Sequence, residues 1–416
     1  MMRDNPVYSD IFLFNPSCDF AVGNGSPYWQ PGKLVRTMEY DLGNLPQFLS
    51  QPGDVVLAAR MPSTRLGEML SGAGFPLPRF EYFNPQDQTI PIPANPAGWL
   101  RPWGWSPATH QQLKNLKPYC SRNFLESPMA EWNPHQRDLF CRDTAADVLQ
   151  MILEESRNPS LMDKSLQPQV CKALPDLDRL ADPWGKLMVK MPWSSSGRGL
   201  QPITRFPLHP SVIQRISGML KSQGHVLAEP LHHKVADLAF LYDVTRDKIH
   251  FSGFSRFITD NKGQYKGNYL NGWPDSFPEE LKKFADMAEA FLPELHIRTL
   301  ERLNVHEIYR GPLGIDTLIF RDKTGHLKIN PCQEINWRYT MGNISLNLEK
   351  SLHRLSHGTF EIVYDFRFPF KDAAKIFLDT NPLVRRDGKI YSGFVPLTEF
   401  TTENHFGAYM LVSPTN

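Results

Sequence analysis

LMVKMPWSSSGRGL, residues 187–200, joins a short apolar run that ends on a lysine to a loop of serine and glycine. The pattern predicts a β-strand that ends at Lys190, followed by a loop rich in free backbone N–H groups and hydroxyls. Together with a fixed cation, these are the groups that bind a polyphosphate. The stretch is not a Walker A loop, because no Gly-Lys-Ser/Thr follows its glycines. Taken alone, it is equally compatible with a surface turn, since Gly and Ser are common in turns.

A second informative cluster lies over a hundred residues later. Residues 314–320 (GIDTLIF) are strand-like, residues 323–325 (KTG) indicate a turn, and the following arm runs through residues 334–338 (EINWR). Alternation along a strand places Glu334, Asn336 and Arg338 on one face, with Asp316 on the other arm of the predicted hairpin. Two carboxylates and an amide oxygen suit Mg²⁺, and an arginine beside them can stabilise phosphoryl or acyl-phosphate charge. The alternative is the polar, solvated face of an edge hairpin.

In this order and spacing, the two clusters resemble the ATP-grasp family, in which two α+β subdomains clamp ATP between antiparallel sheets. The resemblance covers roughly residues 170–345, and the segment before it is similar to the Rossmann-like pre-ATP-grasp domain of that family. The implied fold class is therefore α/β followed by α+β. The domains expected from it are a pre-ATP-grasp α/β domain at 1–120, a helical linker at 121–169, a small lid subdomain at 170–231, a large subdomain with the magnesium site at 232–350, and a C-terminal extension packing on it at 351–416.

The resemblance also implies roles for individual residues. It implies that Lys190 and the serine loop contact the phosphates of ATP and that the segment VLAEPL (226–231) contacts adenine. It also implies that Asp237 contacts the ribose and Lys266 the terminal phosphate. The implied ATP-binding residues are Lys190, Ser194, Ser195, Ser196, Gly197, Arg198, Gly199, Glu229, Leu231, Asp237 and Lys266. The implied magnesium ligands are Asp316, Glu334 and Asn336, with one or two Mg²⁺ ions or Mn²⁺ in their place. The implied catalytic residues are Arg338 and Lys266.

Two features depart from the family's pattern. Asp316 and Glu334 lie 18 positions apart, which is longer than usual for these ligands, so the hairpin is expected to be extended or bulged. The family's other phosphate-directed lysine, upstream of the strand lysine, has no clear counterpart. Arg122, Lys164 and Lys172 all remain candidates.

The N-terminal part reads as a small parallel α/β unit, with apolar runs at 11–14 and 54–59. Asn15 and Asp19 follow the first run, where open α/β sheets place ligands, so they are candidate substrate residues against a capping or turn role. Arg256 is a third candidate, against the reading of a surface arginine. Cys18 as a nucleophile and His232-His233 as metal ligands are both disfavoured.

Other segments give local expectations. Residues 84–107, rich in Pro, Gly and Trp, predict an ordered loop or linker. Ser106-Pro107 has the form of a helix start, with a serine cap and proline at the first helical position. Apolar spacing predicts one amphipathic helix over 135–157 and another near 278–292.

The composition excludes several classes of protein. With 45 Lys+Arg against 44 Asp+Glu in 416 residues, the net charge of +1 gives no global field for nucleic acid or an anionic membrane. No stretch is long and apolar enough to span a bilayer, and the first residues do not resemble a signal peptide. Five dispersed cysteines predict reduced thiols, without a Cys-ligated zinc site. A cytoplasmic protein is expected, possibly a homodimer.

The function implied by the resemblance is an ATP- and Mg²⁺-dependent carboxylate-amine or carboxylate-thiol ligase that forms ADP and phosphate through an acyl-phosphate. Its partners would be a small-molecule or peptide carboxylate and an amine. The alternatives are a kinase-type phosphotransferase of the same fold and a nucleotide-binding protein without turnover. The sequence does not identify the substrates.

Overall fold

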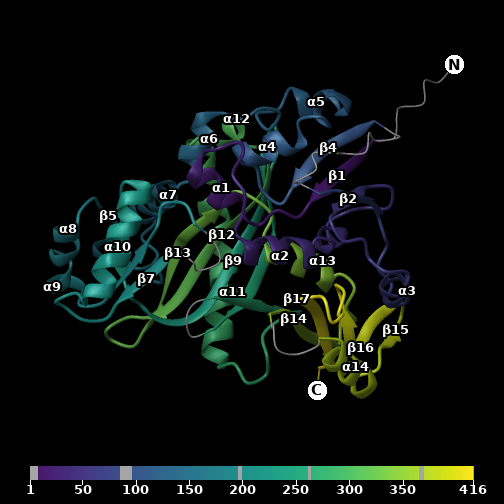
Figure 1. The fold of residues 1–416 in the computed structure, drawn as a ribbon. Helices are drawn as coiled ribbons and strands as arrows, with labels where there is room; N and C mark the ends of the chain where they lie inside the picture. The colour runs from purple at the N-terminus through teal and green to yellow at the C-terminus, as the bar shows by residue number, and fades with distance from the viewer. Residues whose placement is uncertain (1–7, 85–95, 195–198, 261–263, 365–369, 416) are drawn as a thin grey trace.

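The described residues build three β-sheets, two small ones and a large central one, as Figure 1 shows for this computed structural model. The structure describes residues 8–84, 96–194, 199–260, 264–364 and 370–415. In the view of Figure 1, the N-terminal sheet lies at the upper right, the small sheet at the left and the C-terminal strands at the lower right. A parallel sheet followed by antiparallel ones agrees with the predicted α/β and α+β classes.

The N-terminal sheet is parallel, with the order β3-β2-β1-β4. Its first two strands are the apolar runs that the sequence predicted. The elements of this region are β1 (Ser9–Leu13), α1 (Cys18–Asn24), α2 (Lys33–Asp41), the 3-10 helix η1 (Leu45–Phe48), β2 (Val55–Ala58), α3 (Thr64–Ala73), β3 (Arg79–Tyr82), β4 (Ala97–Pro102) and α4 (Pro107–Leu113).

Strand β4 corrects the prediction that all of residues 84–107 form a loop or linker. The strand pairs with β1 at one edge of the sheet, where a terminal Pro102 is tolerated because no further strand needs its N–H. Because residues 84–107 are rich in Pro, Gly and Trp, their composition did not indicate the short strand. The predicted helix start is confirmed, since the Ser106 hydroxyl accepts a hydrogen bond from the Thr109 N–H at 3.1 Å.

A helical segment connects this sheet to the next. Its elements are η2 (Lys117–Tyr119), α5 (Arg122–Leu125), α6 (Pro134–Leu139), α7 (Arg142–Glu155) and η3 (Lys164–Leu166). The single helix expected over 135–157 is wrong in one respect, because Cys141 has extended backbone angles and separates α6 from α7. The apolar face of α7 is confirmed by its buried residues, which are Ala145, Val148, Leu149, Ile152 and Leu153.

The small sheet is antiparallel, with the order β5-β8-β6-β7 and a hydrophobic core of its own. Strand β6 ends at Lys190, as predicted. The elements are β5 (Gln169–Cys171), α8 (Leu174–Asp178), α9 (Ala181–Trp184), β6 (Leu187–Lys190), β7 (Leu200–Ile203), α10 (Pro210–Gln223) and β8 (Val226–Pro230).

The large sheet has the order β13-β12-β9-β10-β11-β14-β17-β16-β15. The segment 351–416, expected as an extension on the large subdomain, adds strands to this sheet, because β14 pairs antiparallel with β11. The elements are β9 (His233–Val244), β10 (Ile249–Thr259), β11 (Tyr265–Leu270), α11 (Glu279–Arg302), α12 (Val305–Ile308), β12 (Gly311–Arg321), β13 (Leu327–Asn336), α13 (Met341–Glu349), β14 (Ser356–Tyr364), α14 (Phe370–Thr380), β15 (Val384–Arg386), β16 (Lys389–Pro396) and β17 (Phe406–Pro414).

The two faces of the large sheet differ in chemistry. Leu238 and Phe240 of β9 belong to the main core, together with Leu281 and Leu292 of α11, whereas Ala239 between them lines a cleft. Helix α11 extends beyond the predicted 278–292 and covers the apolar face. The opposite face is therefore left for polar side chains. Within the described residues, no helix combines the length and the apolar character needed to span a membrane.

Candidate active site

A cleft of about 1850 Å³, partly open to solvent, lies over the polar face of the large sheet. Its walls come from α2, α7, α13, the small sheet and seven strands of the large sheet. The polar side chains that line it include Arg142, Ser255, Thr259, Lys266, Asn268, Asp316, Glu334, Asn336 and Arg338. The folded chain thus brings together the predicted magnesium ligands, both predicted catalytic residues and an arginine that the sequence did not single out.

Asp316 and Glu334 form the acidic pair of this cleft. They are direct cross-strand partners on β12 and β13, and the register shifts between Asp316 and Leu318. The prediction of a bulged hairpin is therefore confirmed. Burial, and then the nearby Glu334 charge, raise the pKa of Asp316 to about 7. Burial alone would raise the pKa of Glu334 as well, but Arg142, Lys190 and Arg338 together outweigh it and hold that pKa below its usual value.

This pair has the character of a cation site. Two carboxylates that share a buried position repel each other, and a cation between them removes that repulsion. Asn336, at the end of β13, adds an amide oxygen that accepts a hydrogen bond from Arg338 Nη2 at 2.6 Å. A carbonyl oxygen has two lone pairs, so this contact leaves one for a metal ion. The donor set fits Mg²⁺.

Arg142, the first residue of α7, is the residue that sequence reasoning missed. It is buried, and its guanidinium donates to Glu334 Oε1 at 2.6 Å, to Ser194 Oγ at 2.6 Å and to the Met191 carbonyl at 2.6 Å. It therefore ties the acidic pair to the start of the serine loop. Apart from its place at a helix start, no local signal distinguished it from the surface arginines of the chain.

Arg338 links the cleft to the N-terminal domain. Its Nε donates to Asp19 Oδ2 at 2.8 Å, and both side chains are largely buried. Burial raises the pKa of Asp19, although Arg338 opposes that shift. Asp19, predicted as a substrate residue, does not line the cleft, but it contacts the cleft-lining Arg338 and orients that arginine.

Lys190 and Glu229 form a buried ion pair at the base of the small sheet. Lys190 Nζ lies 2.7 Å from Glu229 Oε1, and the same oxygen accepts a hydrogen bond from Gln333 of β13 at 2.8 Å. The Leu231 N–H, expected near adenine, donates to the Lys186 carbonyl at 2.9 Å. Glu229 Oε1 and the Leu231 N–H, both from residues predicted to contact adenine, are thus engaged within the protein. These contacts do not involve the second oxygen of Glu229 or the Leu231 carbonyl.

Breaking this ion pair tests how the small sheet is held. We expect Lys190→Met to lower the free energy of unfolding by about 3 kcal/mol, because it leaves Glu229 charged, buried and unpaired. The double variant Lys190→Met/Glu229→Leu should recover most of that loss in chemical denaturation. A double variant as unstable as the single one would contradict this account.

Two further predicted ATP residues lie at or beside the cleft. Lys266 of β11 is exposed and lines the cleft. Asp237 of β9 does not line the cleft. Its Oδ2 accepts hydrogen bonds from Lys234 Nζ at 2.7 Å and from Thr259 Oγ1 at 2.8 Å, and Thr259 is a cleft-lining residue. Asp237 therefore neighbours the cleft through Thr259.

The serine loop is described only at its two ends. Ser194 is buried and bound by Arg142, and Gly199 packs so closely that an added Cβ would lie 2.0 Å from Ser194 Oγ. The ends are therefore held against each other and against α7. The predicted phosphate contacts of Ser195, Ser196, Gly197 and Arg198 lie outside the described residues.

Arg256 is not brought into the cleft. It alternates on β10 with Ser255 and Phe257, which line the cleft, and its guanidinium instead stacks on Phe254 at 4.3 Å and on Trp273 at 5.6 Å. Its predicted substrate role is wrong for this cleft, because strand alternation turns the side chain to the opposite face. Asn15 also lies outside it and donates to Gly104 O and Thr109 Oγ1, both at 2.9 Å.

The three candidates for the upstream phosphate-directed cation are not among the cleft-lining residues. Arg122 pairs with Glu126 at the surface, and Lys164 and Lys172 are exposed. Arg142, which precedes Lys190 in the chain, does line the cleft.

All five cysteines are buried and free, as predicted. Burial raises the pKa of the Cys18 thiol well above its usual value, which keeps it protonated. Cys141, Asp143 and His225 lie within 4.8 Å of one another, but His225 Nε2 already contacts Asp143 at 2.9 Å, and burial raises the pKa of Cys141 to about 12. This group therefore works as a contact between α7 and the small sheet.

A scan with protein-family models found no match for this chain, and neither did a search of curated proteins. Among solved structures, N5-carboxyaminoimidazole synthetase from Staphylococcus aureus, complexed with ADP, is 12% identical at a TM-score of 0.46, covering 100% of this chain and 96% of that one. The biotin carboxylase domain of 2-oxoglutarate carboxylase from Hydrogenobacter thermophilus, complexed with MgADP, is 11% identical at a TM-score of 0.46, covering 88% and 87%. Because these similarities are distant, we infer the function from the residues of the cleft.

Proposed function

We propose that this protein is an ATP- and Mg²⁺-dependent ligase of the ATP-grasp type that joins a carboxylate to an amine. The observation that carries the proposal is the half-buried Asp316–Glu334 pair, opposed across β12 and β13 and flanked by Arg142 and Arg338 in one cleft. Oxygen ligands and several cations around a single cavity match the needs of a nucleotide polyphosphate.

Asp316, Glu334 and Asn336 are the residues that would hold magnesium. When bound, the ion would supply positive charge to neutralise the phosphates of the nucleotide. The protein supplies the surrounding cations: Lys266 at the cleft wall, Arg338 beside Asn336, and Arg142 beside Glu334. Since phosphoryl transfer depends mainly on positioning and charge stabilisation, the site needs no protein nucleophile.

The proposed reaction has two steps. An oxygen of the substrate carboxylate attacks the γ-phosphorus of ATP, the bond to the β–γ bridging oxygen breaks, and ADP leaves. The nitrogen of the amine then attacks the acyl carbon of the resulting acyl-phosphate, inorganic phosphate leaves, and the nitrogen loses a proton. Arg338, held by Asp19, is placed to stabilise the negative charge of the acyl-phosphate.

Nucleotide binding is the first test. In thermal-denaturation experiments on the full chain, MgADP and MgATP should each raise the melting temperature, because a ligand that binds only the folded state stabilises it. ADP with EDTA should give a smaller rise. If neither nucleotide changes the melting temperature, the cleft is not a nucleotide site and the proposed function fails.

Lys266 offers a milder test of the same cleft. Its exposed side chain contributes little to folding, so Lys266→Ala should leave the free energy of unfolding within about 0.5 kcal/mol of wild type. Loss of one charge-assisted contact should weaken MgADP binding about tenfold in calorimetry.

The matched control is Lys248→Ala, which removes an exposed lysine outside the cleft and should leave MgADP affinity unchanged. Equal affinities of the Lys266 and Lys248 variants would remove Lys266 from the phosphate site.

A further inference from the structure

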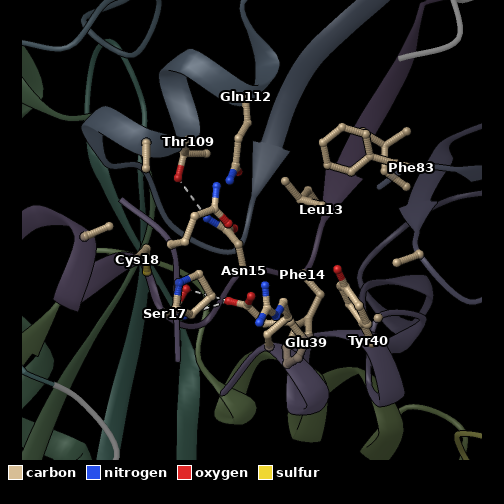
Figure 2. Close-up of a pocket in the computed structure, with 18 of the residues that line it drawn as sticks. Leu13, Phe14, Asn15, Ser17, Cys18, Glu39, Tyr40, Phe83, Thr109 and Gln112 are labelled. Carbon is tan, nitrogen blue, oxygen red and sulfur yellow. Dashed lines mark hydrogen bonds between the residues drawn. The ribbon is translucent and has the colours of Figure 1, made fainter. Parts of the chain in front are cut away.

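A second cavity lies in the N-terminal domain, at the carboxyl end of the parallel strands β1 and β2. The space in and in front of it, counted together with the open solvent at its mouth, is about 660 Å³, and Figure 2 shows it between the segment after β1, helix α2 and helix α4. Open α/β sheets bind ligands at this edge. The nucleotide cleft does not use this cavity, and its lining is chemically distinctive.

One carboxyl group dominates the polar lining. Glu39 of α2 accepts hydrogen bonds at Oε1 from the Ser17 hydroxyl at 2.6 Å and from the Ser17 N–H at 3.2 Å, as Figure 2 shows for this pair. Among the described residues, the structure records no donor to its other oxygen. Glu39 lines the cavity, so that oxygen is available to a ligand.

The rest of the lining complements a molecule with an apolar body. The aromatic side chains are Phe14, Trp29, Tyr40 and Phe83, joined by Leu13 and Leu57. Arg36, one helical turn from Glu39 on α2, supplies the only cation among the described lining residues. A carboxylate and a guanidinium beside aromatic walls match the ammonium, carboxylate and side chain of an apolar amino acid.

The cavity abuts the nucleotide cleft. Met38 and Pro16 line the cleft, while their chain neighbours Glu39 and Ser17 line the second cavity. At Gly104, an added Cβ would lie 2.3 Å from Cys18 Sγ and 3.0 Å from Arg338 Cβ, so only this glycine separates the two side chains. The segment after β1 and helix α2 therefore each contribute residues to both cavities.

We propose that the second cavity binds an amino acid with a large apolar or aromatic side chain, its ammonium group on Glu39 and its carboxylate on Arg36. Its role as the amine substrate rests on the proposed function, whereas its binding does not. Ser17 holds the Glu39 carboxyl in place by two hydrogen bonds, and the aromatic residues receive the side chain.

The test is calorimetric titration of the full chain, without nucleotide, using the L and D forms of leucine, methionine, phenylalanine, tyrosine and tryptophan. At least one should bind. For the best binder, the analogue lacking the amino group (3-phenylpropionate in the case of phenylalanine) should bind at least about tenfold more weakly, because a charge-assisted contact is lost.

Two variants assign the contacts. Glu39→Gln keeps the acceptor for Ser17 and should weaken amino acid binding about 10- to 100-fold. Arg36→Gln should weaken binding of the amino acid. It should not weaken binding of the matching amine that lacks the carboxylate, which is 2-phenylethylamine in the case of phenylalanine. The control Glu68→Gln changes an exposed residue of α3 outside both cavities and should bind like wild type.

The pH dependence gives a further readout. Burial raises the pKa of Glu39 to about 7, and the hydrogen bonds from Ser17 and the charge of Arg36 oppose that shift. The titratable and charged groups facing it are Arg36 on its own helix and Cys18 of α1, whose thiol stays protonated. Because the ammonium group requires ionised Glu39, affinity should rise about tenfold between pH 6 and pH 8, and Glu39→Gln should abolish the rise.

The results separate this inference from the proposed function. Failure of all ten amino acids to bind, equal binding of the analogue without the amino group, or an unchanged Glu39→Gln variant overturns the inference. Amino acid binding without any MgADP effect on the melting temperature supports the cavity and rejects the ligase. A MgADP effect without amino acid binding supports the ligase and overturns the inference about the cavity.

Discussion

Glu334→Gln should remove the dependence of ADP affinity on Mg²⁺, with a loss of at least about 100-fold in any Mg²⁺-dependent ATP turnover. Glu334 is the carboxylate that the cleft holds ionised, because Arg142, Lys190 and Arg338 together outweigh the effect of burial on its pKa. An amide in its place keeps the shape but removes the charge that a hard divalent cation requires.

The measurement is a calorimetric titration of ADP at several Mg²⁺ concentrations, with phosphate release over panels of carboxylates and amines as the activity readout. Glu280→Gln is the matched control, because Glu280 is an exposed acid that pairs with Arg321 outside the cleft. If Glu334→Gln retains the full magnesium dependence, the acidic pair is not the metal site.

Arg142→Ala should destabilise the fold and the cleft together. The substitution leaves the half-buried Glu334 carboxylate without its strongest partner and removes the donors to Ser194 and Met191. We expect the free energy of unfolding to fall by about 5 kcal/mol, at the upper end for a broken buried pair, and MgADP binding to be lost.

Denaturation and amide hydrogen exchange check this expectation separately. Exchange should accelerate at Arg142 and Met191, whose N–H groups donate to the Pro192 and Gly199 carbonyls. The double variant Arg142→Ala/Glu334→Ala should be more stable than the sum of the single effects predicts, since each side chain is the other's partner. Arg65→Ala, an exposed arginine of α3, is the control and should behave like wild type. Additive single effects would show that the contact does not couple the two residues.

Much of the site followed from local sequence. Strand alternation placed Glu334 and Asn336 on one face, and the 18-residue spacing from Asp316 implied the bulge that the register shift shows. A strand ending at Lys190 was readable for the same reason, because a strand's pattern depends on its own few residues. The same rule of alternation, applied to β10, would have placed Arg256 away from Ser255 and Phe257.

Two other features of the fold, strand β4 and the helix break at Cys141, could not be predicted from the local sequence. Strand β4 carries prolines and glycines that usually indicate loops, and its pairing with β1 overrides that preference. The break at Cys141 interrupts a continuous apolar pattern, and only the path of the chain around the cleft requires it.

The sequence by itself determined the α/β and antiparallel segments, the acidic hairpin and the lysine strand, because these depend on residues close together in the chain. The tertiary structure alone decided which cations meet the hairpin. Arg142 and Glu334 are 192 residues apart, and Asp19 and Arg338 are 319 apart. Such contacts carry no local periodicity, since they arise when α7 packs beside β13 and α1 meets the end of the hairpin. The second cavity has the same origin, because Ser17 and Glu39 come together only when α2 folds back over the carboxyl end of β1.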